Sequence, residues 1–204
     1  MDDNVLLSGL LIGFGIAAPV GPIGVLCIKR TLNEGRLVGI ATGLGAATAD
    51  ALYGLIAGLG LTSISSLLVA QQSWLRLFGG LFLLYLGIST FASRPPDAAT
   101  PTRLRSLPWV YTSTFLLTTS NPMTILSFVA VFAGLGVVVG SSYASVALLV
   151  LAVFAGSAAW WLLLVGLVGW LRLRLSADIL RWVNRLSGVL ICAFGLLAIV
   201  SLLA

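Results

Sequence analysis

The longest stretch without charge constrains this chain more than any other feature. From Ser106 to Leu171 no residue is charged, and that run is too long for one helix across a bilayer, since a span needs about 20 residues. The whole chain of 204 residues is 59% hydrophobic and 8% charged, with a mean hydropathy of +1.13. A soluble domain carries about 25% charged residues, so the composition indicates helices packed in lipid.

Charged residues and turn residues divide the chain into six expected spans. A segment rich in glycine and serine, Gly134 to Ser145, splits the long uncharged run, and a proline-containing segment, Ala92 to Leu107, precedes it. The spans are expected at Val5–Ile28, Leu37–Leu61, Trp74–Phe91, Pro108–Gly134, Tyr143–Leu171 and Trp182–Leu203. We therefore predict an all-α integral membrane protein with six transmembrane helices.

The basic residues predict how this bundle is oriented. Apart from Arg76, they fall in three gaps on one side of the membrane: Lys29, Arg30 and Arg36; Arg94, Arg103 and Arg105; Arg172, Arg174, Arg181 and Arg185. Cytoplasmic loops carry an excess of Lys and Arg, so these loops are expected in the cytoplasm and both termini outside. Because the charges sit in short gaps beside lipid headgroups, they favour membrane lipid as a partner over nucleic acid.

A weak internal repeat relates the two halves of the chain. The spacing of a tryptophan and two glycines recurs after 108 residues: Trp74, Gly80 and Gly87 correspond to Trp182, Gly188 and Gly195. Three spans per half is an odd number, so the halves would have opposite orientations. We predict two inverted three-helix repeats, residues 1–93 and 108–204, joined by a cytoplasmic linker at 94–107. Transporters with this architecture hold their substrate near the bilayer midplane.

The first span is predicted to break near its middle. Pro19 and Pro22 each remove a backbone donor and clash with the preceding turn, and Gly21 lies between them. Pro22 suits the first position of a second half-helix. The start of such a half-helix carries partial positive charge, which suits a substrate carboxylate. The alternative is a structural kink without a ligand.

The fourth span offers a counterpart to this break. Ser120 or Asn121 can cap a half-helix, and Pro122 can occupy its first position. Paired interruptions in corresponding spans point to a transport site. Asn121 could equally be a purely structural cap.

Asp50 is the only acidic residue deep in any expected span. It shares a helical face with small residues such as Gly43 and Gly54, so this face should pack inside the bundle, with Tyr53 close by. An ionised, unpaired carboxylate there costs about 3 kcal/mol or more. Asp50 is therefore a candidate to carry a proton or to meet a substrate ammonium. The alternative is a protonated Asp50 that hydrogen-bonds a broken helix.

Other residue types limit the chemistry. Cys27 and Cys192 form no CxxC pair, and the chain has no histidine, so no zinc site, redox pair or histidine relay is indicated. We assign no catalytic residue, metal ligand or cofactor and do not expect an enzyme. The spacing of Gly54 and Gly58 could pack helices within one chain or within a homo-oligomer. Trp161 lies deeper than an interfacial belt requires, as a cavity-lining residue or one in ordinary packing.

Together these features resemble the lysine exporter translocator family of amino-acid exporters, the LysE/RhtB type. The resemblance covers essentially the whole chain and rests on Pro19 to Pro22, on the glycine-rich second span with Asp50, and on Asn121 followed by Pro122. It implies export of amino acids or close derivatives across a bacterial inner membrane, driven by protons or the membrane potential. Family members that export basic amino acids tend to have a second acid shortly after Asn-Pro. Residues 123–127 contain none, which favours small neutral substrates resembling homoserine or threonine.

We therefore predict a secondary active, proton-coupled exporter. The two broken helices would bind the substrate carboxylate, and Asp50, helped by Tyr53, would take the ammonium or the counter-moving proton. A divalent metal-ion exporter of related architecture is the alternative. Metal sites use clustered acidic, cysteine or histidine ligands, and a single intramembrane Asp weighs against one.

Overall fold

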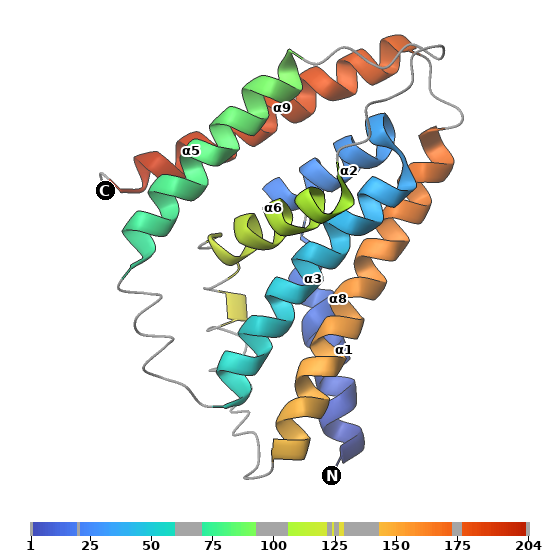
Figure 1. Ribbon diagram of the computed structural model, residues 1–204, viewed down its shortest axis with the longest axis vertical. Helices are drawn as coiled ribbons and strands as arrows, with labels where there is room; N and C mark the ends of the chain where they lie inside the picture. The colour runs from blue at the N-terminus through green and yellow to red at the C-terminus, as the bar shows by residue number, and fades with distance from the viewer. Residues whose placement is uncertain are drawn as a thin grey trace.

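A computed structural model describes residues 2–19, 21–59, 71–92, 106–121, 124, 127–128, 143–172 and 177–202. Every regular element within these residues is an α-helix (Figure 1). The helices are α1 Asp2–Ala17, α2 Pro22–Glu34, α3 Arg36–Gly58, α5 Gln72–Phe91, α6 Leu107–Thr119, α8 Tyr143–Arg172 and α9 Ala177–Val200. The expected linker at 94–107 and the expected turn at Gly134 to Ser145 lie largely outside the described residues.

Three helices are individually long and apolar enough to cross a membrane, at Arg36–Ile56, Tyr143–Arg172 and Arg181–Val200. A fourth span arises if α1 and α2 cross as one bent pair, while α5 contributes a shorter apolar stretch, Arg76–Phe91. The described residues thus form a helical membrane protein with several spans. A total of six spans stays a prediction.

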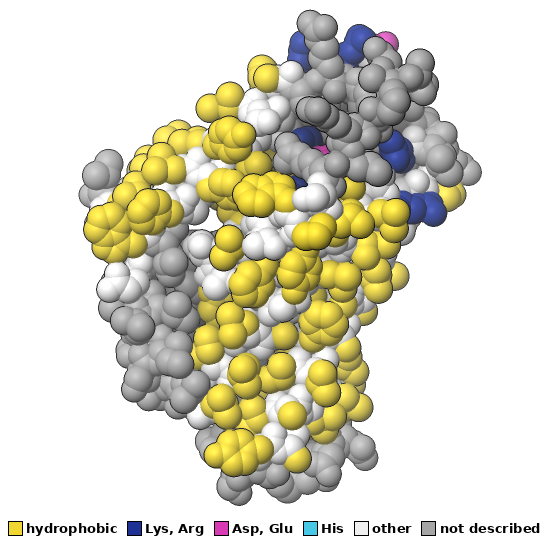
Figure 2. Space-filling model, viewed as in Figure 1, with side chains coloured by type: hydrophobic (Ala, Val, Ile, Leu, Met, Phe, Trp, Pro, Cys, Tyr) yellow, Lys and Arg dark blue, Asp and Glu magenta, His cyan; other side chains and the backbone are white. Residues whose placement is uncertain are grey.

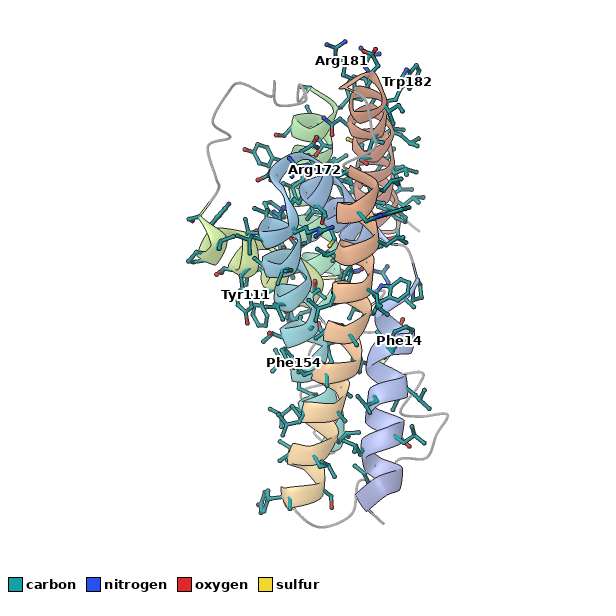
Figure 3. All side chains as sticks on the ribbon, turned by 90° about the vertical axis from the view of Figure 1, so that its right-hand side faces the viewer. Phe14, Tyr111, Phe154, Arg172, Arg181 and Trp182 are labelled. Carbon is teal, nitrogen blue, oxygen red and sulfur yellow. The ribbon has the colours of Figure 1, made fainter. Side chains whose placement is uncertain are left out.

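Glycine faces bring α3 and α8 into close contact. A Cβ added at Gly43 would press on the Trp161 side chain, and one added at Gly54 would lie 3.4 Å from Val153. Asp50 lies between these glycines and is 3% exposed. The prediction that the small-residue face of this helix points into the bundle is therefore confirmed. In Figures 1 and 3, α1, α3 and α8 run alongside one another.

The helices α5 and α9 form a second packed unit that lies beside this bundle (Figure 1). Gly80 faces Gly195 and Gly87 faces Gly188, because a Cβ added at any of the four would come within 3 Å of the carbonyl oxygen of its opposite glycine. Close backbone approach between membrane helices favours such small residues. The pair also contacts α2 through α9.

The structure corrects the expectation that Lys29 and Arg30 lie in a loop. Both are inside α2 and buried, and Arg30 is only 1% exposed. The Arg30 guanidinium donates hydrogen bonds to the hydroxyls of Thr114 (2.7 Å), Thr42 (3.2 Å) and Ser113 (3.3 Å). Arg30 thus joins α2 to α3 and α6.

The helix boundary explains this correction. The chain turns between α2 and α3 at Gly35, whose φ of 99° suits glycine. Because the break after Ala17 restarts the helix at Pro22, its second half continues to Glu34 instead of ending near Ile28.

The charged surface is polarised. Figure 2 shows Lys and Arg gathered at the upper end of the visible face, above a broad apolar surface. Figure 3 places Arg172 and Arg181 toward that end and Phe14 and Phe154 below them. This separation is typical of a protein with one basic, membrane-adjacent end. The predicted loop residues Arg94, Arg103, Arg105 and Arg174 lie outside the described residues.

The glycine contacts predict a selective effect of small substitutions. Gly87→Ala should lower the free energy of unfolding by about 1–3 kcal/mol, because its Cβ would overlap the backbone nitrogen of Cys192 and the carbonyl oxygen of Gly188. Gly166→Ala is the matched control, since nothing lies within 4 Å of its added Cβ, and it should change stability by less than about 1 kcal/mol. Unfolding in detergent micelles measures both. Equal effects would contradict close packing at Gly87.

Candidate functional site

The first span is interrupted where the two prolines predict it. α1 ends at Ala17, α2 begins at Pro22, and the two helix axes are bent by 77°. Gly21 is the N-cap of α2, is extended (φ −103°, ψ −167°), and forms no side-chain capping bond. The first N–H groups of a helix have no partner within that helix. The start of α2 therefore offers backbone donors and the positive end of the helix dipole.

The fourth span is also interrupted at its predicted position. α6 ends at Thr119, and the chain turns at Ser120 and Asn121. The Asn121 N–H donates to the Thr118 carbonyl oxygen at 3.1 Å, and the Asn121 carbonyl accepts from the Thr124 N–H at 3.1 Å. Pro122, which the sequence places after this turn, lies outside the described residues.

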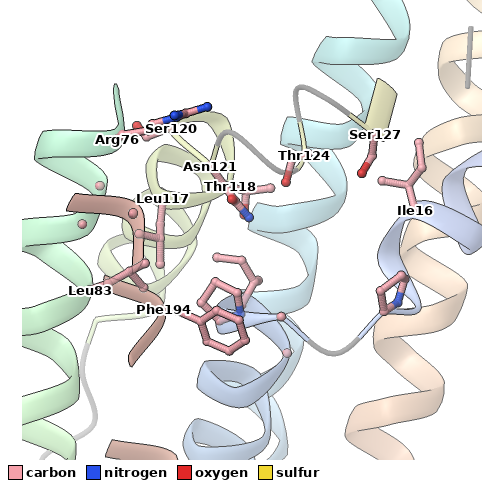
Figure 4. Close-up of a pocket in the computed structure, with 18 of the residues that line it drawn as sticks. Ile16, Arg76, Leu83, Leu117, Thr118, Ser120, Asn121, Thr124, Ser127 and Phe194 are labelled. Atoms are coloured by element: carbon pink, nitrogen blue, oxygen red, sulfur yellow. The ribbon is translucent and has the colours of Figure 1, made fainter. Parts of the chain in front are cut away.

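A cavity of about 550 Å³ lies where the two breaks meet (Figure 4). Its walls come from both sides of the first break and from α3, α5, α6, α8 and α9. Six of the eight residues predicted to bind substrate line it: Pro19, Gly21, Pro22, Asp50, Ser120 and Asn121. The volume lies in the range of small-molecule sites.

The Asp50 carboxylate is held at this cavity by α8. Its Oδ2 accepts a hydrogen bond of 2.6 Å from the hydroxyl of Ser157, which is fully buried. Sequence reasoning missed Ser157, although a lone hydroxyl in the apolar stretch before Trp160 was the available signal. The pair brings a proton-accepting group to a site that is shielded from solvent.

The structure places Tyr53 at the α6 break. Its side chain is buried but is not among the cavity-lining residues. The hydroxyl donates to the carbonyl oxygen of Thr119, the last residue of α6, and the ring lies 5.5 Å from that of Phe128. One helical turn separates Tyr53 from Asp50 by sequence, yet its side chain ties α3 to the α6 break instead of entering the cavity.

The buried polar groups at the cavity include a hydroxyl and an indole nitrogen with no hydrogen-bond partner among the described residues. They are the hydroxyl of Thr118, which is 3% exposed, and the indole nitrogen of Trp161, which is 5% exposed. Leaving such a group unsatisfied costs about 1–3 kcal/mol. Each group could therefore form a hydrogen bond with a polar ligand in the cavity.

Arg76 lines the cavity, although the sequence predicted no role for it at the site. It lies in α5, lines the cavity, and its Nη1 donates to the carbonyl oxygen (3.2 Å) and hydroxyl (3.4 Å) of Ser201. Within the described part of the chain, Asp50 and Arg76 are the two charged residues of the lining. The same part holds no group of three Cys, Asp or Glu side chains that could bind a metal ion.

The fold and the cavity define a helical, multi-pass membrane protein with a cavity at its broken helices that contains a few polar groups. The chain belongs to the LysE type translocator family, which it matches over residues 14–202. The expected family resemblance is thereby confirmed.

Two bacterial proteins are similar to this chain. One is the "Putative amino acid efflux protein YcgF" of Bacillus subtilis (strain 168), 30% identical over 198 residues that cover 94% of this chain and 93% of the relative. The other is the "Uncharacterized membrane protein YahN" of Escherichia coli (strain K12), 35% identical over 111 residues, or 52% of this chain and 48% of the relative. No solved structure matches.

The unsatisfied indole predicts a ligand-specific effect. Trp161→Phe removes the buried N–H, so it should weaken L-threonine binding by about 3- to 10-fold, as expected for one lost hydrogen bond. Trp160→Phe is the matched control, because Trp160 packs against Phe14 and is not a cavity-lining residue. It should leave affinity within about twofold. The shift in unfolding temperature with L-threonine concentration measures both affinities. Equal affinities in the two variants would contradict a ligand contact at Trp161.

Proposed function

We propose that this protein is a secondary active exporter of amino acids or close derivatives in a bacterial inner membrane. The main observation that supports this proposal is the cavity at which the break of the first span, the turn after α6 and Asp50 meet. Membership of a translocator family and similarity to a protein named for amino acid efflux support the same class. In this proposal the chain moves a solute and catalyses no covalent reaction.

The substrate carboxylate binds at the start of α2. Gly21, Pro22, Ile23 and Gly24 all line the cavity, and the helix start offers N–H groups and a partial positive charge without burying a cationic side chain. Helix N-termini hold substrate carboxylates in this way in other transporters with discontinuous helices. Ser120 and Asn121 add polar groups from the second break.

Asp50 receives the substrate ammonium or the counter-moving proton. Its carboxylate is buried, lines the cavity and has the Ser157 hydroxyl as a hydrogen-bond donor. A buried carboxylate that is alternately protonated and paired with an ammonium links substrate release to proton uptake. Proton coupling through Asp50 follows from this exchange.

Alternating access arises from movement of two inverted repeats, residues 1–93 and 108–204. The glycine contacts support this. In the predicted repeat, Gly80 corresponds to Gly188 and Gly87 corresponds to Gly195. Gly80 packs against Gly195, and Gly87 packs against Gly188. Such crosswise pairing is what a two-fold axis generates. In the same repeat, α1 corresponds to α6 and α3 corresponds to α8. The contact between α1 and α8 therefore has a symmetric counterpart in the contact between α6 and α3, and both contacts are present. Six spans in total leave both termini on the same side of the membrane, and cytoplasmic basic loops make that side the outer one.

The preferred substrates are small and neutral, resembling homoserine or threonine. The α5 and α9 walls are mainly glycine and apolar residues, including Leu83 and Phe194, so they offer no carboxylate to a basic side chain. The alternative, a divalent metal-ion exporter, would need clustered hard ligands. No described observation favours it over an amino acid.

Coupling through Asp50 predicts a loss that depends on the proton gradient. In proteoliposomes, Asp50→Asn should reduce gradient-driven accumulation of L-threonine by about tenfold or more, because the amide neither binds nor releases a proton. Asp178→Asn is the control, since Asp178 is exposed and pairs with Arg181, and it should behave like the wild type. Undiminished gradient-driven transport by Asp50→Asn would rule out the coupling role.

A further inference from the structure

The cavity has a charged residue that neither end of an α-amino acid needs. In the proposed function, the start of α2 binds the carboxylate and Asp50 meets the ammonium. Arg76 lines the cavity from a different wall, α5, together with Gly79, Gly80 and Leu83. The substrate side chain is the part left to face this wall.

Arg76 is fixed in place by its neighbours. Its Nη1 donates to both the carbonyl oxygen and the hydroxyl of Ser201, just beyond the end of α9. One turn further along α5, a Cβ added at Gly79 would lie 3.5 Å from the carbonyl oxygen of Ser120. Figure 4 shows Arg76 and Ser120 in the same upper part of the cavity. Arg76 therefore lies where α5, the end of α9 and the α6 break approach one another.

A fixed guanidinium here acts on any charge brought to this wall. Its two hydrogen bonds to Ser201 lie on the exposed side of this wall, and a guanidinium there repels any second positive charge that comes close. A substrate with a cationic side chain would meet this repulsion, whereas a neutral side chain of the same size would not.

We propose that Arg76 is a specificity residue that excludes amino acids with cationic side chains from the cavity. The inference rests on the proposed function and assigns its preference for neutral side chains to one residue. Discrimination here arises from a repulsive group placed against the wrong substrate, a recognised route to specificity. The same charge disfavours a divalent metal ion as cargo. The alternative is that Arg76 only links α5 to the end of α9. In that case, replacing Arg76 would not change the preference for neutral over cationic side chains.

Competition between matched amino acids tests this role. Proteoliposomes containing the full-length chain carry out L-threonine counterflow, and L-lysine and L-norleucine compete with it. These competitors share a linear side chain and differ in the terminal ammonium. The wild type should be inhibited by norleucine at about tenfold or more lower concentration than by lysine. The readout is a ratio within one preparation, so partial loss of folded protein does not shift it.

Three variants separate charge from tethering. Arg76→Gln should bring the two inhibitory concentrations within about threefold of each other, and Arg76→Glu should reverse the preference toward lysine. Arg185→Gln, a change at an exposed arginine of α9 that lies outside the cavity lining, should keep the wild-type ratio.

Two results would overturn the assignment while leaving the proposed function intact. One is a wild type that accepts lysine as readily as norleucine, a result that needs no variant to fold. The other is a wild-type ratio in both Arg76→Gln and Arg76→Glu. Absence of saturable amino-acid counterflow in the wild type would instead overturn the proposed function, and with it the role of Arg76.

Discussion

A helix that breaks inside a bilayer exposes backbone groups that lipid cannot bond, and this constraint governs the whole structure. Such groups must face protein or a water-containing cavity. The break between Ala17 and Pro22 therefore has to be surrounded. Here α3, α8 and the end of α6 lie around it and enclose a cavity instead of closing completely on it. The same surroundings that shield the broken backbone from lipid leave a cavity with a few polar groups inside an apolar fold.

Close helix packing makes this enclosure feasible. Membrane helices gain little from burying apolar side chains against each other, so their association depends on shape and on close backbone contact. Glycines supply that contact between α3 and α8 and between α5 and α9. Arg30 adds a polar link, since its guanidinium reaches Thr42 on α3 and Thr114 on α6. The second half of the broken helix is thereby held by hydrogen bonds as well as by packing.

Much of this arrangement could be predicted because it follows from local chemistry. Two prolines near the middle of an apolar span break a helix wherever the helix lies, and a small-residue face that bears Asp50 turns inward because lipid penalises the charge. The starts and ends of α3, α5 and α8 accordingly lie close to the expected span limits. These features need no knowledge of how the helices cross.

Residues whose roles depend on helix crossing could not be placed in this way. Tyr53 follows Asp50 by one turn, yet the packing of α3 against α6 brings its hydroxyl to the carbonyl oxygen of Thr119. Arg30 was assigned to a cytoplasmic loop because the distribution of basic residues along the chain does not show where a helix ends. Ser157 and Arg76 enter the site only through the packing of α8 against α3 and of α5 against α9. Charge and hydropathy along the chain contain no information about those contacts.

Amide hydrogen exchange at the start of α2 tests most directly whether the broken helix holds the substrate. L-threonine at saturating concentration should slow exchange in the segment from Gly21 to Leu26 by about tenfold, because its carboxylate would accept hydrogen bonds from the first amides of the helix. Amides of α9 between Leu186 and Leu190, outside the cavity lining, should be unaffected. Threonine binding that leaves exchange at Gly21 to Leu26 unchanged would contradict a substrate site at the helix break.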